Sequence, residues 1–166
     1  ASNVEITIIT SPFCNYCLSA HNILEKILKD TEEKIKIKVL INADIDSLDE
    51  LKKTFFRSLM AIYIERGESS FLEALHSWFI NKNLSDWLEK YKMTCNENEI
   101  DSIYRAQHQW CFVNNNYFTP TIFINDYPYP KIYKREDLEF FIKDIIEDDL
   151  FVYKLNYGNT NLKPMI

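Results

Sequence analysis

The strongest candidates for catalytic side chains are two cysteines near the start of the chain, which are separated by two residues. They lie in the segment Ser11-Pro12-Phe13-Cys14-Asn15-Tyr16-Cys17. A thiolate at the first turn of a helix faces unpaired backbone N–H groups and the positive end of the helix dipole, which lower its pKa. A second thiol three residues later can displace the partner from a mixed disulfide. The spacing therefore predicts a redox-active dithiol, with Cys14 as the nucleophile and Cys17 as the resolving thiol.

The alternative interpretation of this pair is half of a zinc or iron–sulfur site, which needs two further ligands. Cys95 and Cys111 are the other cysteines of the chain, and they do not form a second C-x-x-C. No pair of histidines at ligand spacing supports them either. The sequence thus favours redox chemistry, with no metal ligands assigned.

The elements around the dithiol are those that would position it. The β-branched run from residue 4 to residue 10 predicts a buried strand directly before the cysteines. Apolar spacing predicts a helix from about Cys14 to Lys29, and the run 35–41 predicts a second strand. Because a helix connects these strands, we expect them to pair in parallel.

The middle of the chain predicts four helices and no sheet. The first begins at an N-cap formed by Asp46-Ser47 and ends at Gly67. Three more are expected at 69–80, 84–92 and about 96–114. The apolar stripe of the first helix is formed by Leu48, Leu51, Phe55, Leu59 and Ile62.

The segment Tyr117-Phe118-Thr119-Pro120-Thr121-Ile122-Phe123-Ile124 is followed by a turn at Asn125-Asp126 and an amphipathic helix at 136–147. With the strand, C-x-x-C and helix at the start of the chain, this pattern resembles the thioredoxin-fold oxidoreductases, especially the DsbA-like branch with a helical insertion. The resemblance implies a cis bond before Pro120, opposite the dithiol. The Thr119 backbone would then pair with an extended substrate strand. Phe13 and Tyr16 would either form an apolar rim or pack as ordinary core aromatics.

The fold class that follows is α/β, a thioredoxin-like fold with an inserted helical subdomain. Residues 1–44 would form the first half of the core and 45–116 the insertion. Residues 117–148 would form the second half of the core, and 149–166 a C-terminal extension.

Two features of the sequence depart from the resemblance. The family commonly has a buried acid six residues before the first cysteine, where this chain has Ile8. The dipeptide Asn15-Tyr16 has neither the histidine of strong oxidants nor the Gly-Pro of thioredoxin. The residues therefore do not fix the redox potential. His21 is expected on the helix face that carries the cysteines, where it either tunes the resolving thiol or lies at the core boundary.

Cys95 and Cys111 are expected to be free buried thiols and not a disulfide. One continuous helix between them would hold them more than about 20 Å apart, whereas a disulfide needs Cα atoms within roughly 7 Å.

The predicted function is a thiol–disulfide oxidoreductase acting on protein cysteines, with no organic cofactor. The alternatives are a thioredoxin-like reductase, a disulfide isomerase, or a redox-silent protein-binding module of the same fold. The resemblance implies a periplasmic or other extracytoplasmic location. A membrane redox partner of the vitamin K epoxide reductase type is a further expectation, because the aromatic-rich insertion resembles the thioredoxin-like domains associated with bacterial homologues of that enzyme.

Composition narrows the function classes. A net charge of −6 argues against binding to nucleic acid or to an anionic membrane surface. No apolar run reaches the roughly 20 residues of a membrane-spanning helix. No signal peptide is recognised before the first strand, as expected for a mature protein or a domain of a longer one.

Overall fold

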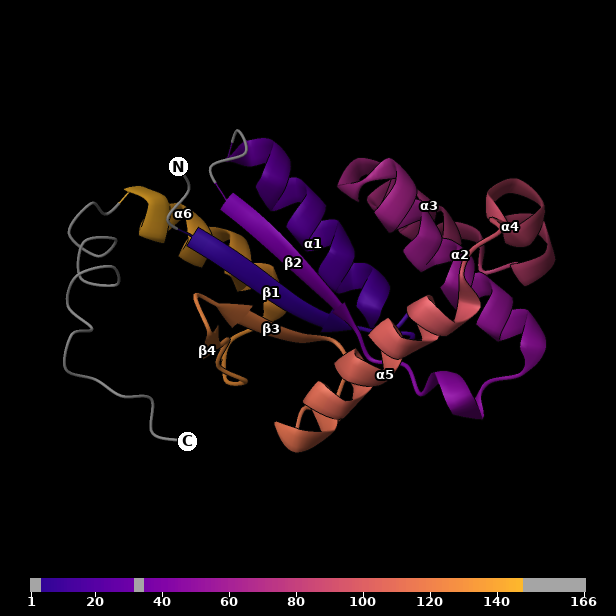
Figure 1. Cartoon of the computed structure of the whole chain (residues 1–166). Helices are drawn as coiled ribbons and strands as arrows, with labels where there is room; N and C mark the ends of the chain where they lie inside the picture. The colour runs from indigo at the N-terminus through magenta and orange to yellow at the C-terminus, as the bar shows by residue number, and fades with distance from the viewer. Residues whose placement is uncertain (1–3, 32–34, 148–166) are drawn as a thin grey trace. The chain divides into compact units, whose positions relative to one another are not determined.

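The structure of the chain is a computed structural model that describes residues 4–31 and 35–147 (Figure 1). The predicted extension at 149–166 lies outside these residues. The strands are β1 (Val4–Thr10), β2 (Ile35–Ile41), β3 (Thr121–Ile124) and β4 (Tyr127–Pro128). The α-helices are α1 (Cys17–Asp30), α2 (Glu50–Arg66), α3 (Glu68–Asn81), α4 (Leu84–Tyr91), α5 (Glu97–Val113) and α6 (Leu138–Glu147). Short 3₁₀ helices cover Ile45–Ser47 and Arg135–Asp137.

Contacts divide the chain into two compact units. Among the described residues, the sheet unit consists of 4–8, 19–31, 35–39 and 121–147, and the helical unit consists of 9–18 and 40–120. Cys14, Cys17, Thr119 and Pro120 all belong to the helical unit. The candidate site can therefore be described within one unit.

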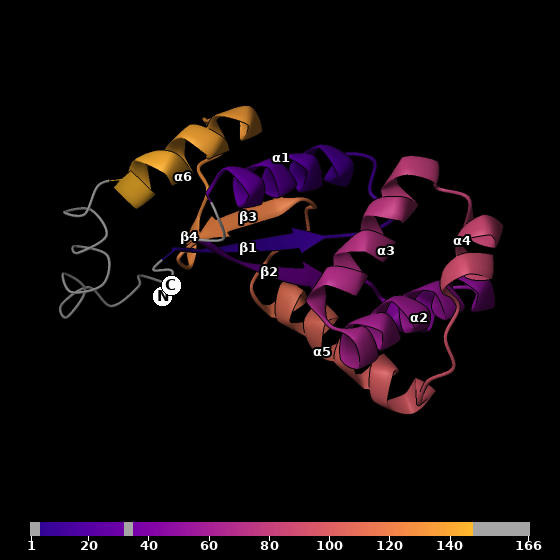
Figure 2. The same ribbon diagram turned by 90° about the horizontal axis from the view of Figure 1, so that it is seen from above.

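The sheet unit contains a four-stranded sheet in the order β2-β1-β3-β4. β1 and β2 run in the same direction, as predicted, and β3 runs opposite to β1 (Figure 2). β3 pairs with β4 in antiparallel register, Ile124 opposite Tyr127. Helices α1 and α6 cover one face of the sheet (Figure 2). The core that they enclose is aliphatic and is formed by Val4, Ile6, Ile8, Ala20, Leu24, Ile27, Ile35, Ile122, Leu138, Ile142 and Ile145.

The turn predicted at Asn125-Asp126 is confirmed and needs no glycine. Both residues have positive φ angles, 47° and 69°, as in the tight turns whose twist matches a β-hairpin. Asparagine and aspartate tolerate this region better than other side chains do. The Asn125 side-chain oxygen accepts a hydrogen bond from the Glu5 backbone N–H at 2.7 Å. The Asn125 backbone N–H donates to the Glu5 carbonyl at 2.8 Å. The turn is thus tied to β1.

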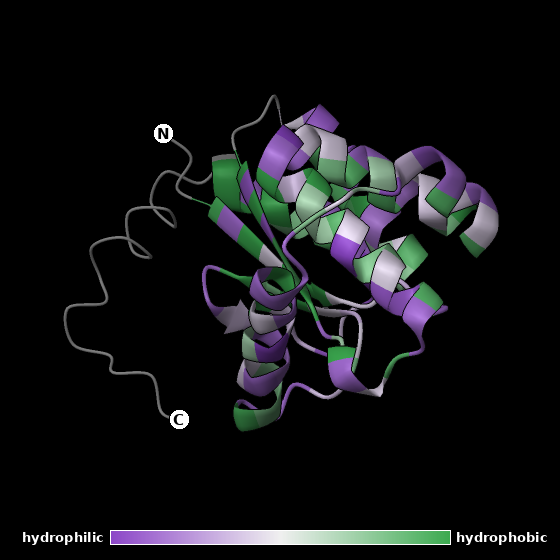
Figure 3. Ribbon diagram, turned by 45° about the vertical axis from the view of Figure 1, so that its right-hand side comes forward, coloured by the Kyte–Doolittle hydropathy of each residue, from purple (hydrophilic) through white to green (hydrophobic). Residues whose placement is uncertain are grey.

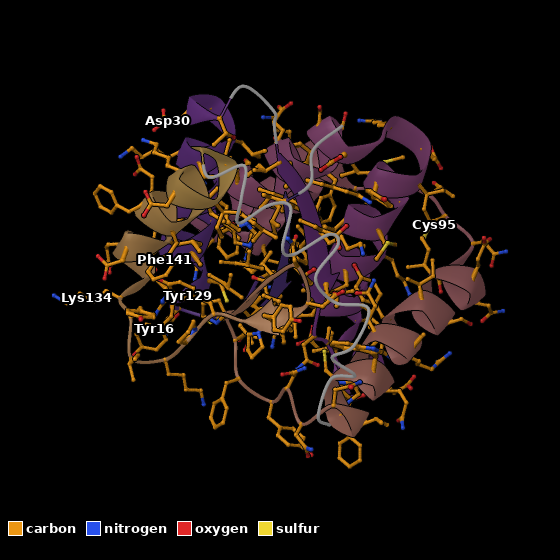
Figure 4. The ribbon with its side chains drawn as sticks, turned by 90° about the vertical axis from the view of Figure 1, so that its left-hand side faces the viewer. Tyr16, Asp30, Cys95, Tyr129, Lys134 and Phe141 are labelled. Carbon is orange, nitrogen blue, oxygen red and sulfur yellow. The ribbon has the colours of Figure 1, made fainter. Side chains whose placement is uncertain are left out.

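Charged and aromatic contacts join α6 to its neighbours in the sheet unit. Glu139 accepts hydrogen bonds from Lys26 on α1, at 2.6 Å, and from Lys143, at 2.7 Å. The Phe141 ring contacts that of Tyr129 at 5.7 Å between centroids, and Figure 4 shows both residues near the loop that carries Lys134. These contacts fix the angle at which α6 lies along the sheet.

The helical unit is built around α2, which packs against α3, α4 and α5. Its helices carry hydrophilic and hydrophobic residues in alternating bands, as expected of amphipathic helices (Figure 3). The four predicted helices are confirmed. Their observed ends differ from the predicted ones by one or two residues, except at the start of α2. Their largest buried side chains are Phe55, Phe56, Leu59, Ile62, Phe71, Leu75, Trp78, Phe79, Trp87, Ile100 and Tyr104.

The predicted start of α2 is wrong. Residues 45–47 form a separate 3₁₀ turn anchored by the buried Ile45, and the helix begins after Asp49, whose carboxylate accepts from the Lys52 N–H at 2.9 Å. With this start, Leu51 falls in the first turn and is 62% exposed. Leu48 lies before the helix and is only partly buried, whereas Phe55, Leu59 and Ile62 are buried as predicted. Gly67 ends the helix with φ of 81°, a conformation that costs glycine little.

A nearly buried ion pair links α2 to α5. Arg57 donates two hydrogen bonds to Asp101, at 2.9 and 2.8 Å, and the two side chains are only 13% and 10% exposed. These hydrogen bonds outweigh burial and lower the pKa of Asp101. A buried charge that loses its partner is costly, so the pair should matter to stability.

We expect Asp101→Asn to lower the free energy of unfolding by about 2 kcal/mol near neutral pH. The folded pKa of Asp101 is depressed, so its stabilising contribution is present above the unfolded pKa of about 3.9 and is lost as the pH falls through the folded pKa. The deficit of the variant should therefore shrink in acid. Urea unfolding near pH 7 and near pH 3 measures this; an equal deficit at both would contradict the assignment.

Among residues 4–31 and 35–147, no helix has the length and hydrophobicity needed to cross a lipid bilayer.

Candidate functional site

The cysteine segment forms a turn between β1 and α1. The Cys14 N–H donates to the Ser11 carbonyl at 3.0 Å, and α1 begins only at Cys17. The prediction that the helix starts at about Cys14 is therefore wrong. The Ser-Pro pair favours a turn, and the Trp78 indole holds this turn by donating to the Pro12 carbonyl at 2.6 Å. Cys14 consequently lies just before the helix and not within its first turn.

Cys14 is partly exposed and is a free thiol. Its Sγ donates a hydrogen bond to the Thr119 carbonyl at 3.4 Å. Partial burial raises the pKa of Cys14, but hydrogen bonds from Cys17, from Thr119 and from the backbone at Tyr16 and Cys17 together outweigh it, so the pKa is lowered. The N–H groups at the start of α1 thus act on Cys14 as the sequence predicted, although Cys14 lies outside the helix.

Cys17 is fully buried. Burial raises the pKa of this thiol, and Cys14 raises it further, whereas the Thr10 side chain and the Ser11 backbone lower it. The net shift is upward. The two thiols share a hydrogen bond, and their pKa values are shifted in opposite directions: downward for the partly exposed Cys14 and upward for the buried Cys17.

Thr119, which precedes Pro120, lies beside the dithiol, as the resemblance implied. The bond between them is cis. The Thr119 carbonyl faces the Cys14 sulfur, and the preceding residue, Phe118, has an exposed side chain. This backbone and the Cys14 thiol are therefore brought together from positions 105 residues apart.

The two aromatics of the segment have different surroundings. Phe13 is 36% exposed and its ring contacts those of Phe55, Phe56 and Trp78 at centroid distances of 5.5, 5.7 and 5.0 Å. It is a packing residue with one open edge. Tyr16 is 70% exposed. Of the pair, Tyr16 has the larger surface for a rim contact.

Three residues near the cysteines were missed by sequence reasoning. Thr10 contacts the Cys17 sulfur, and Trp78 holds the cysteine turn. The Lys82 ammonium donates to the Cys14 carbonyl at 3.5 Å. Lys82 and Trp78 are more than 60 residues from the cysteines, and no local pattern links such positions. Thr10 is close to the cysteines in sequence, but β1 also contains Glu5 and Thr7, so the sequence alone did not single it out.

The other cysteines are free, as predicted. Cys111 is buried, whereas Cys95, which precedes α5, is only partly buried. Burial raises the pKa of both thiols. Within the described residues, no three His, Cys, Asp or Glu side chains converge in a way that could hold a metal ion. His21 is buried in the sheet unit.

Comparison with known proteins bears on the fold. No family model and no curated protein sequence matches the chain. A periplasmic thioredoxin-like protein from Salmonella enterica serovar Typhimurium is 16% identical with a TM-score of 0.67, over 86% of this chain and 84% of that one. Oxidised BdbD from Bacillus subtilis is 14% identical with a TM-score of 0.65, over 86% and 87%. Reduced DsbA1 from Neisseria meningitidis is 14% identical with a TM-score of 0.60, over 92% and 86%.

These likenesses cover most of the chain and confirm the predicted fold class. The protein has a thioredoxin-like α/β fold of the DsbA type, with a helical insertion.

Proposed function

We propose that this protein is a thiol–disulfide oxidoreductase that acts on the cysteines of other proteins. The observation that carries the proposal is the contrast between its two neighbouring thiols. Cys14 is partly exposed with a lowered pKa, and Cys17 is fully buried with a raised pKa. A nucleophile must be accessible and ionised, whereas a resolving thiol must wait until the mixed disulfide has formed.

In the proposed reaction, the Cys14 thiolate attacks one sulfur of a substrate disulfide and the other substrate sulfur leaves as a thiolate. Cys17 then attacks Cys14, which releases the second substrate sulfur and leaves a Cys14–Cys17 disulfide. In the opposite direction, a substrate thiolate attacks that disulfide and the same steps run in reverse. Both directions pass through the same mixed disulfide at Cys14.

The proposed substrate is an extended polypeptide that lies against Thr119 and Pro120. Main-chain hydrogen bonds give affinity with little dependence on side chains, and the Thr119 backbone lies within 3.4 Å of the attacking sulfur. Exposed Tyr16 would contact the substrate next to its cysteine, with the open edge of Phe13 beside it. Such a site suits an enzyme with many protein substrates.

One structural neighbour supports a location outside the cytoplasm, since it is named as a periplasmic thioredoxin-like protein. We propose an extracytoplasmic location and a membrane protein that exchanges electrons with the Cys14–Cys17 pair. A partner of the vitamin K epoxide reductase type is the specific form of this proposal.

The test is the reduction potential of the Cys14–Cys17 pair, measured by equilibration with glutathione or dithiothreitol buffers. We expect one reversible two-electron couple. A potential near −120 to −180 mV would indicate disulfide donation or isomerisation, and one near −270 mV would indicate a reductase. The absence of any reversible couple would overturn the proposal and favour a protein-binding module that does not use its dithiol.

A further inference from the structure

Thr10 is a buried polar residue at the carboxyl end of β1, in the same unit as the dithiol. Its side chain is fully buried, as is that of Cys17. Its backbone is fixed, because its carbonyl accepts a hydrogen bond from the Asn42 N–H at 2.9 Å. Its side chain forms a hydrogen bond with the Cys17 sulfur. A hydroxyl is thus held against the resolving thiol where no water reaches either group.

The groups around Cys17 differ in whether they favour its thiolate form. Burial and the neighbouring Cys14 both disfavour the thiolate form of Cys17. Thr10 favours it, through the hydrogen bond between its side chain and this sulfur. The Ser11 backbone acts in the same direction as Thr10. Ile8, two residues earlier on the strand, offers only an aliphatic side chain.

A hydroxyl suits this position because its hydrogen rotates. It can accept a hydrogen bond from the Cys17 thiol, and it can donate one to the Cys17 thiolate. Both protonation states are therefore satisfied without movement of the backbone. Since an unpaired buried charge is costly, a donor held at this sulfur lowers the barrier to forming the thiolate.

We propose that the Thr10 hydroxyl stabilises the Cys17 thiolate at the moment when Cys17 enters or leaves the disulfide. The inference rests on the proposed function, because it concerns the second step of the same exchange. In that step Cys17 gives up its proton to solvent, its sulfur forms a bond to the Cys14 sulfur, and the bond between Cys14 and the substrate breaks. The substrate sulfur leaves with the electron pair and takes up a proton from solvent.

The same contact acts when electrons flow the other way. A substrate thiolate then attacks Cys14, and Cys17 leaves as a thiolate that Thr10 receives with its hydroxyl. The titratable group that acts on Cys17 is Cys14, and the Lys82 ammonium donates to the Cys14 carbonyl. A change at Thr10 should therefore affect the second step far more than the first.

The experiment is a stopped-flow reaction of the reduced protein with an aromatic disulfide that releases a coloured thiol, such as Ellman's reagent. Attack by Cys14 releases one thiol at a rate that depends on reagent concentration. Resolution by Cys17 releases a second thiol at a rate that does not. A Cys17→Ser control lacks the second phase and so identifies it, and it separates that phase from any reaction at Cys95.

We expect Thr10→Val, which keeps the shape of the side chain, to slow the second phase about tenfold, as for the loss of a hydrogen bond to a charged group. Its pH profile should move to higher pH, since the Cys17 thiol would ionise less readily. The first phase should change by less than about twofold, which also shows that the variant is folded. Thr10→Ser keeps the hydroxyl and should retain the wild-type second phase.

Equal second-phase rates and pH profiles in the wild type and in Thr10→Val would overturn the inference. A slow second phase in Thr10→Ser would also overturn it, because the hydroxyl would then not be the active feature. If Thr10→Val fails to fold, Thr10→Ala gives the same comparison. Failure of the proposed function looks different, since the wild-type protein itself would show no concentration-independent phase.

Discussion

Replacement of Cys14 by serine should abolish thiol–disulfide exchange, with at least a roughly 10³-fold loss in the turnover of a protein disulfide. Loss of a covalent nucleophile usually removes most of the rate enhancement, and a serine hydroxyl stays protonated where the Cys14 thiol ionises. The partly exposed Cys14 is the thiol placed to meet a substrate, whereas Cys17 is fully buried. Insulin reduction by dithiothreitol, followed by turbidity, measures this turnover.

Cys17→Ser should fail in a different way. Cys14 can still attack, but no thiol remains to release the substrate, so a mixed disulfide should accumulate and be visible by mass spectrometry without reductant. Cys95→Ser is the matched control, because Cys95 is also a partly exposed free thiol but has a raised pKa. It should retain wild-type turnover.

Two outcomes would contradict this assignment. Substantial turnover in Cys14→Ser would mean that the dithiol is not the reacting group. Loss of turnover in Cys95→Ser would mean that a second thiol takes part. A redox-silent binding module would instead bind its partner equally well with and without Cys14.

Much of the fold follows from local features of the sequence. The β-branched run at Val4–Thr10 forms β1, and Gly67 ends α2 as expected of the residue that adopts positive φ most easily. The turn at Asn125-Asp126 is likewise fixed by its own two side chains. In each case the physical cause acts within a few residues, so the sequence pattern is sufficient.

The site depends on contacts that no local pattern contains. The Trp78 indole donates a hydrogen bond to the Pro12 carbonyl from 66 residues away. Pro12 is part of the turn in which Cys14 lies, before the start of α1 at Cys17. The placement of Thr119 beside Cys14 followed from the resemblance to a family and not from the residues themselves. The start of α2 was mispredicted because the buried Ile45 anchors a separate 3₁₀ turn. Side-chain packing over long range decided each of these points.

Phe55→Ala should give the largest loss of stability, about 3–5 kcal/mol in the free energy of unfolding. Phe55 is fully buried in the helical unit. Its ring contacts those of Phe13, Trp78 and Trp87 at centroid distances of 5.5, 4.7 and 4.3 Å. Removing it leaves a cavity and withdraws favourable aromatic contacts at the same time. Urea unfolding followed by circular dichroism measures the loss.

The same substitution should also change the surroundings of Cys14, because the Phe13 and Trp78 side chains that contact Phe55 also stabilise the turn that contains Cys14. We therefore expect the rate of Cys14 alkylation by iodoacetamide to change in Phe55→Ala, in native buffer where the protein stays folded. Phe71→Ala is the matched control. Phe71 is also a buried phenylalanine of this unit, but its ring contact is with Tyr63 at 5.7 Å.

Phe71→Ala should lower stability and leave alkylation at the wild-type rate, because its cavity lies away from the Phe13 and Trp78 contacts. If both variants altered Cys14 equally, the effect would come from general loosening of the helical unit and not from the aromatic contacts. Phe55→Leu tests the same point with less damage, since leucine fills much of the cavity but cannot reproduce the ring contacts. An intermediate loss of stability with an altered alkylation rate is the result that the packing around Phe55 predicts.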